Sequence, residues 1–170
     1  MVFSIEFDIE TVSTLAVADD AVDWMQIPPQ GHIVDEWILP KFYFTGSHMP
    51  DYLMNDVGWH ICSLKLVDAI ASVCTELDFV RFLPVHVYTS DRIIEYYVIH
   101  IEKATNAIDI YATVYIDDAI VKPAFKSYAL EGVNIFSYYN SEKIYITEQL
   151  HSRILYTDCS GISFNPCECS

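Results

Sequence analysis

Two apolar segments in the middle of the chain constrain its fold more than any other feature. FVRFLPVHVYT (79–89) and IIEYYVIHIEK (93–103) are dense in β-branched and aromatic residues, and only SDR separates them. Runs of this composition joined by a short polar turn indicate an antiparallel β-hairpin. Pro84 has no backbone N–H to donate, so its strand is expected at a sheet edge or with a bulge.

The centre of the hairpin turn decides which histidines share a face. With Asp91 at that centre, His86 would face Tyr96 and His100 would face Phe82. The two histidines would then share a face, about four strand positions and roughly 13 Å apart. That separation is too large for both rings to bind one metal ion. We therefore expect structural or surface roles for both histidines.

A helical period precedes the hairpin and returns near the carboxyl end. SLKLVDAIASVC (63–74) repeats apolar residues at helical spacing after Ser63, a residue type that caps helices. A second helix is expected after Thr147, with Glu148 in its first turn and an apolar stripe behind it. Further strands are expected in 2–9, 37–44, 108–117, 120–130, 134–139, 143–147 and 161–166. The sequence therefore predicts an α+β fold, a mostly antiparallel sheet with two or three packed helices.

Two stretches near the amino terminus indicate a short helix and a loop. DDAVDWMQIPP (19–29) predicts a helix that Asp19 or Asp20 caps and that Pro28 ends. TGSHMPDYLMNDVG (45–58) has glycine, proline and asparagine spaced through it, which is typical of a loop. Val2–Ile9 alternates apolar and acidic residues, which predicts a strand buried on one face.

The charge of the chain is strongly negative and unevenly distributed. The net charge is −15 over 170 residues, a length typical of one domain. Residues 1–60 hold ten acids and one base, Lys41, whereas 61–170 hold fourteen acids and eight bases. We treat 1–60 as a divergent acidic part of the single domain 1–170. Such a chain repels nucleic acid and anionic membranes, so a basic protein is the expected partner, with simple solubility as the alternative.

Hydropathy favours a folded protein that does not cross a membrane. Mean hydropathy is +0.23 and 52% of residues are hydrophobic, which argues against disorder. No apolar run approaches the roughly 20 residues that a membrane-spanning helix needs. MVFSIEFDIET lacks the basic and apolar regions of a secretory signal, so we expect a soluble cytoplasmic protein.

The residues that could carry chemistry do not form a recognisable site. The cysteines are odd in number, and the spacing of Cys159, Cys167 and Cys169 does not suit zinc, so reduced thiols in a frayed tail are expected. His60 and Cys62 could form a nucleophile pair only if the backbone turned between them. Adjacent carboxylates and scarce glycine support neither acid–base catalysis nor a phosphate loop. We expect no metal, no cofactor and no catalytic residue.

Aromatic and acidic residues in the first 60 positions suggest an interaction surface instead. All three tryptophans lie there, either as core residues or as anchors that bury area against a partner. Carboxylates around such anchors would steer a basic protein toward them. The residues expected to bind are Asp19, Asp20, Asp23, Trp24, Asp35, Glu36 and Trp37.

An ordered series of motifs in 61–166 resembles a known family. The series runs CSLKLVDAIASV, FLPVHVY, EYYVIHIEKATNAIDI, NIFSYYNSEKIYITEQLHSRI and SGISFNP. It is similar to bacterial polymorphic-toxin immunity protein family eleven, formerly a domain of unknown function. Relatives often carry an arginine after the Ile-Phe pair, where this chain has Ser137, so no role of that arginine transfers here. Residues 1–60 align with no part of the family.

The resemblance implies an immunity protein that is not an enzyme. Such a protein binds and neutralises a cognate secreted toxin domain by occlusion, and the acidity of this chain suits a basic target such as a nuclease. One alternative is a small hydrolase or transferase that uses Cys62 or a histidine. Another is an acidic nucleic-acid mimic that inhibits a DNA-binding protein.

Overall fold

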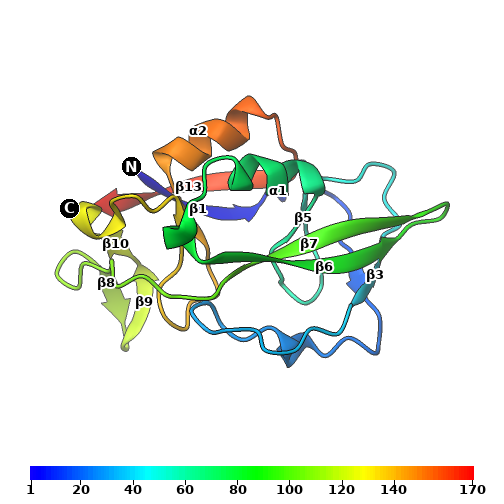
Figure 1. Cartoon of the computed structure of the whole chain (residues 1–170), viewed down its shortest axis with the longest axis horizontal. Helices are drawn as coiled ribbons and strands as arrows, with labels where there is room; N and C mark the ends of the chain where they lie inside the picture. Colours follow the sequence, from blue (N-terminus) through cyan, green and yellow to red (C-terminus); the bar gives the residue numbers. More distant parts are fainter.

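The central hairpin is the longest strand pair of the protein. The computed structural model describes residues 1–170, and in it β6 (Val80–Tyr88) pairs antiparallel with β7 (Ile93–Ile101) along their whole length (Figure 1). The hairpin prediction is therefore confirmed, but its register is shifted by one residue. His86 lies opposite Glu95, and His100 lies opposite Arg81. The two histidines consequently sit on opposite faces of the sheet, not on one face as expected.

Pro84 lies in an internal strand, contrary to the expectation of an edge or a bulge. β6 is bordered by β7 on one side and by the parallel strand β3 (Lys41–Tyr43) on the other, and its register with β7 is continuous. His86 donates its N–H to Pro40 on the β3 side, and Pro84, two residues earlier, faces the same side. β3 begins opposite His86, so no strand lies beside Pro84 on this side and the missing N–H leaves no acceptor unpaired in the sheet.

The hairpin belongs to a six-stranded sheet that is buried on both faces. The strand order is β2-β3-β6-β7-β5-β4, in which only β3 and β6 run parallel. The remaining strands are β2 (Val17–Ala18), β4 (Tyr52–Leu53) and β5 (Ile61–Cys62). The segment 45–58, expected as a loop, thus contributes β4, whose two residues are completely buried.

A five-stranded sheet brings both ends of the chain together. Its order is β10-β13-β1-β12-β11, and only β10 and β13 run parallel. The strands are β1 (Val2–Phe7), β10 (Ala124–Phe125), β11 (Ile135–Phe136), β12 (Tyr145–Thr147) and β13 (Ile162–Cys169). β1 is central and buried on both faces, so the prediction of a half-buried strand is wrong. Phe3 and Ile5 join the main core, whereas Val2 joins a smaller cluster with Phe125 and Tyr145.

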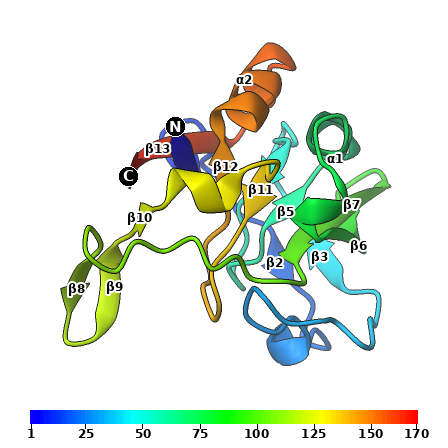
Figure 2. The ribbon, with the colours of Figure 1, turned by 60° about the vertical axis from the view of Figure 1, so that its left-hand side comes forward.

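Two α-helices pack side by side over the junction of the sheets (Figure 2). α1 (Leu64–Ala71) begins after Ser63, whose hydroxyl accepts the N–H of Leu66, as the sequence predicts. α2 (Glu148–Tyr156) follows β12 directly. Their buried residues join those of β1, β7 and β12 in the largest core cluster, so the α+β prediction is confirmed. No helix is long and apolar enough to cross a membrane.

The remaining helical turns are short 3₁₀ segments. These are η1 (Trp24–Gln26), η2 (Glu76–Asp78) and η3 (Ser127–Leu130). The helix expected in 19–29 is reduced to η1, and Asp23 caps it, not Asp19 or Asp20. Pro28 and Pro29 prevent η1 from continuing beyond Ile27.

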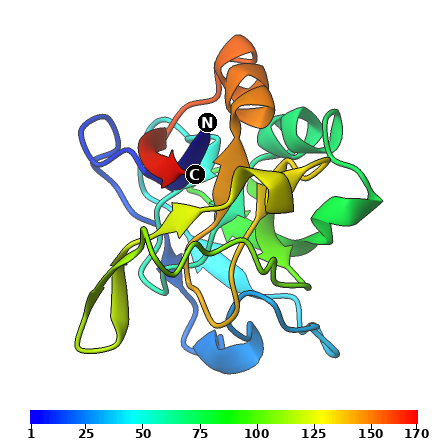
Figure 3. The same cartoon turned by 90° about the vertical axis from the view of Figure 1, so that its left-hand side faces the viewer.

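The region 108–122 differs from the expected continuous strands. It contains a separate two-stranded hairpin, β8 (Val114–Ile116) and β9 (Ala119–Lys122), which pairs with neither large sheet (Figure 3).

The carboxyl end also differs from expectation, because Cys167 and Cys169 lie in β13 and not in a frayed tail. All five cysteines are free thiols.

Candidate interaction surface

The segment between β2 and β3, in the acid-rich part of the chain, covers the outer face of the six-stranded sheet. Val34 belongs to a second core cluster with apolar side chains of β6 and β7, and Val22 and Trp37 pack against this cluster. In Figure 1 the light-blue segment that leads to β3 runs below β3 and β6. Its apolar residues thus hold it on the sheet, while most of its carboxylates face solvent.

We define the 19–41 face by its solvent-facing acids and the exposed apolar side chains beside them. A groove of about 260 Å³ lies between the turn around η1 and residues 38–41, and Asp19, Asp23 and Lys41 line it. Asp35 and Glu36 lie outside the groove on the segment that leads to it. The face comprises Asp19, Asp20, Asp23, Trp24, Met25, Asp35, Glu36, Ile38 and Leu39.

Two of the five acids are held by local hydrogen bonds. Asp19 accepts the N–H of Ala21 at 3.0 Å and the hydroxyl of Tyr43 at 2.9 Å. The bond from Ala21, followed by that from Tyr43, lowers the pKa of the Asp19 carboxyl. Asp23 accepts the N–H of Met25 at 2.9 Å and thereby caps η1. These hydrogen bonds fix the direction of both carboxylates.

The other three acids have no internal partner. Asp20, Asp35 and Glu36 are exposed and make no hydrogen bond with another residue, and none of the five ion pairs of the protein involves the 19–41 face. Lys41 is the only base in residues 1–60. The negative charge of this face is therefore largely uncompensated and acts on approaching solutes.

The structure separates the roles of the three tryptophans. Trp24 is 65% exposed on η1 and makes no hydrogen bond through its ring, so it is free to contact a partner. Trp37 is half-buried, and its indole N–H donates to the carbonyl oxygen of Pro84 at 2.8 Å. Trp59 is a core residue that packs its ring against those of Trp37 and Phe42. Of the two predicted anchors, only Trp24 stands free of the core.

Three apolar residues of the face were missed by the sequence prediction. Met25, Ile38 and Leu39 are exposed, and Ile38 reaches 77%. The N–H of Ile38 donates to the side chain of Gln26 at 3.3 Å, which joins this segment to η1. Trp37, Ile38 and Leu39 are consecutive apolar residues that were expected to belong to a strand over 37–44, and nothing in this run signals exposure. The arrangement could not be deduced because β3 begins only after Pro40.

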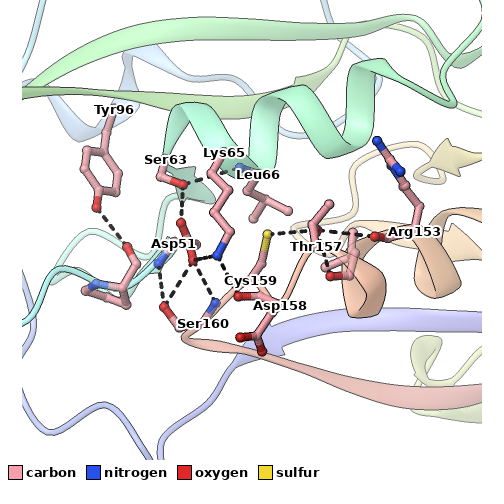
Figure 4. A network of polar contacts seen from close by, with 12 residues as sticks. Asp51, Ser63, Lys65, Leu66, Tyr96, Arg153, Thr157, Asp158, Cys159 and Ser160 are labelled. Atoms are coloured by element: carbon pink, nitrogen blue, oxygen red, sulfur yellow. Dashed lines mark hydrogen bonds and ion pairs between the residues drawn. The ribbon is translucent and has the colours of Figure 1, made fainter.

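A network of polar contacts around the half-buried Asp51 joins three segments of the chain (Figure 4). Its carboxylate accepts bonds from the Ser63 hydroxyl at 2.6 Å, the Lys65 ammonium at 3.2 Å and the Ser160 N–H at 2.9 Å. Lys65 also donates to the carbonyl of Asp158 at 2.7 Å. Desolvation raises the pKa of Asp51, but these bonds outweigh it and the net pKa is lowered.

The geometry of this network suits joining segments, not catalysis. Asp51 is too acidic to take a proton at neutral pH, and Ser63 already caps α1. The network ties the loop before β4 to the start of α1 and to the turn between α2 and β13. It therefore fixes the packing of the helices on the sheets.

Cys62 lies in the core and not in a reactive site. It is completely buried, and burial raises the pKa of its thiol well above the ordinary value. His60 does not bond it; one His60 ring nitrogen accepts the hydroxyl of Tyr52 and the other donates to the carbonyl of Glu142 at 2.7 Å. A nucleophilic thiolate needs the opposite environment, exposed and electropositive.

Metal-binding geometry and similarity to known proteins add no further site. No group of three or more histidine, cysteine, aspartate or glutamate residues could hold a metal ion. Comparison with protein-family models finds no match to this chain, and no curated protein matches its sequence. The 19–41 face is thus the candidate functional site, on its geometry alone.

Proposed function

We propose that the protein is an immunity protein that acts in the cytoplasm. It would bind a secreted bacterial toxin domain and cover the surface that the toxin domain needs for its activity. The observation that carries the proposal is the 19–41 face. Carboxylates without internal partners lie beside exposed Trp24, Met25, Ile38 and Leu39, a combination that fits a protein partner. Exposed apolar side chains supply buried area on binding, and unpaired acids favour a basic partner.

The distribution of the resembling motifs supports the same proposal. The motifs of 61–166 form α1, the β6–β7 hairpin, β12, α2 and β13, which together make the scaffold. The 19–41 face lies outside that series. A shared scaffold with a divergent, charged surface is suited to recognising one particular toxin and rejecting others.

The charge of the chain narrows the class of toxin. A net charge of −15 raises the association rate with a basic domain and opposes contact with nucleic acid. A nuclease domain is such a target, because its cleft must attract phosphate. Blocking that cleft requires no chemistry from the inhibitor, so the proposed protein is not an enzyme.

The test is capture and protection with the toxin encoded beside this chain. The tagged protein is co-expressed with the carboxyl-terminal domain of the secreted protein from the adjacent reading frame. We expect a stable complex in size-exclusion chromatography and survival of cells that otherwise die from the toxin domain. Cys62→Ala should protect as well as the native protein, whereas a hydrolase or transferase that uses Cys62 would lose its activity in this variant. Absence of a complex, with toxicity undiminished, would reject the proposal.

A further inference from the structure

The β8–β9 hairpin projects from the body of the protein as a separate arm. Its two strands, Val114–Ile116 and Ala119–Lys122, pair only with each other, so both outer edges of the pair are free. Figures 2 and 3 show the arm extending away from both sheets. Two-stranded hairpins alone are marginally stable in water, so an arm of this kind gains from a partner.

The arm exposes apolar side chains that the fold does not cover. Tyr111, in the turn that leads into β8, is 92% exposed, and Ile116 is 60% exposed. Several exposed apolar side chains on one small projecting element are a feature of interaction sites on folded proteins. The exposed apolar residues of the arm are Ile110, Tyr111, Val114, Tyr115, Ile116 and Val121.

The base of the arm is firmly attached to the core. Asp109 donates its N–H to the carbonyl of Ala124 at 2.8 Å, and Ala124 donates its own N–H to the Thr113 hydroxyl at 3.0 Å. Phe125, which follows, is completely buried among the rings of Phe136 and Tyr145. These contacts hold the two ends of the arm together on the protein, so a partner would meet it with little loss of chain entropy.

The tip of the arm is acidic and free of internal cations. Asp117 and Asp118 form the turn with φ values of 47° and 67°, are exposed, and enter no ion pair or hydrogen bond. The one base in the strands, Lys122, is paired with Glu168. The arm therefore carries two carboxylates at its tip and its exposed apolar side chains along the strands and at its base.

We propose that this arm is a second toxin-binding element, which enters a cleft of a basic polypeptide where lysine or arginine side chains adjoin apolar surface. This inference rests on the proposed function and extends it from the 19–41 face to a separate part of the chain. Charge complementarity selects the occupant. A second copy of this chain, at −15, would bring acidic arms together, whereas a basic domain pairs with Asp117 and Asp118.

Two double variants separate the acidic tip from the apolar sides. Asp117→Asn with Asp118→Asn removes both charges, and asparagine tolerates positive φ, so the turn is retained. Tyr111→Ser with Ile116→Thr removes exposed apolar surface without touching the core. The matched control, Asp68→Asn with Asp158→Asn, removes two exposed charges on the helical side, and Asp158 also has a positive φ of 52°.

Binding of each variant to the adjacent toxin domain is measured by surface plasmon resonance at several salt concentrations, after circular dichroism confirms folding. The tip variant should slow association several-fold at low salt and converge with the native protein at high salt. The apolar variant should raise Kd on the order of tenfold, mainly through faster dissociation. The control should bind like the native protein.

Each contrary result has a distinct meaning. If both arm variants bind like the native protein while a variant with the five acids of the 19–41 face replaced by their amides binds weakly, the arm inference is wrong and the proposed function stands. If the native protein does not bind the toxin domain, both the proposed function and the arm inference that rests on it are rejected. If sedimentation shows a dimer of this chain that the arm variants dissociate, the occupant is a second copy and the inference is overturned.

Discussion

The indole N–H of Trp37 donates a hydrogen bond of 2.8 Å to the carbonyl oxygen of Pro84. The carbonyl and the missing N–H of Pro84 face the side on which β3 has not yet begun. Trp37 therefore satisfies an acceptor that no strand reaches, and it joins the acidic segment to the central hairpin. The residue expected to anchor a partner instead holds the 19–41 face in place.

Because Trp37 and Trp24 have different roles, substitution of Trp37 should mainly lower stability and substitution of Trp24 should mainly weaken binding. Trp37→Phe loses the bond to Pro84 and should lower the free energy of unfolding by about 1 kcal/mol. Trp24→Ala should change it by less than about 0.5 kcal/mol, because the side chain is exposed, yet weaken toxin binding. Urea unfolding followed by circular dichroism measures the first quantity. Equal stability losses for the two variants would contradict this assignment.

The Asp51 network predicts a large stability loss on removal of one side chain. Asp51→Ala leaves Ser63, Lys65 and the Ser160 N–H without their common acceptor and should cost about 2–3 kcal/mol. Asp91→Ala, which removes one exposed bond from Thr89, is the control and should cost much less. A loss below 1 kcal/mol for Asp51→Ala, by the same urea titration, would show that the network contributes little (about the value of one ordinary hydrogen bond).

Two histidines, the half-buried His60 and the buried His100, predict a loss of stability in mild acid. Burial lowers the pKa of His60 and of His100 below the ordinary 6.5. Between each lowered pKa and 6.5 the unfolded chain binds more protons, so the free energy of unfolding rises with pH in that window. It should fall as pH drops below about 6.5 and level off above it.

His60→Gln isolates one of these contributions. Glutamine can still donate to the Glu142 carbonyl, but it does not titrate. Its unfolding free energy should therefore depend less steeply on pH from about 6.5 to 5.5 than that of the native protein. Identical slopes, measured by denaturant titration at each pH, would mean that His60 does not contribute.

Burial of Cys62 predicts an unreactive thiol. In the native protein, Ellman's reagent should modify the exposed Cys169 rapidly and leave Cys62 untouched until the protein unfolds. Cys62→Ala should cost about 1 kcal/mol from lost packing. Fast labelling of Cys62 in the native state, identified by mass spectrometry, would show that it is more accessible than the structure indicates.

The 19–41 face predicts a charge-dependent association rate. Converting Asp19, Asp20, Asp23 and Asp35 to asparagine and Glu36 to glutamine keeps the capping oxygens and removes five charges. Association with the toxin domain should slow on the order of tenfold at low salt and lose much of its salt dependence.

A control with the same net charge makes this test specific. It replaces five exposed acids without internal partners by their amides elsewhere on the protein. These acids are Asp68, Glu76, Glu131, Glu142 and Asp158. If the two variants slow association equally, only the total charge matters and the face has no special role.

Local patterns in the sequence were sufficient for several elements. Ser63 with its helical repeat predicted α1, and two β-rich runs predicted the β6–β7 hairpin. These signals depend on neighbours in the chain, since a cap or a short turn uses contacts within a few residues. The excess of acids in 1–60 also follows from composition alone.

Tertiary structure decided what depends on contacts distant in sequence. The hairpin register is one residue away from the expected one and sets His86 and His100 on opposite faces of the sheet. Apolar side chains pack on both faces of the hairpin, so the local sequence pattern did not distinguish between the two registers. Pairing with β1 ordered the cysteine-rich end, and the start of β3 after Pro40 left Ile38 and Leu39 exposed. Sequence thus determined which segments would form helices and strands, and long-range packing determined which of their side chains remain available to a partner.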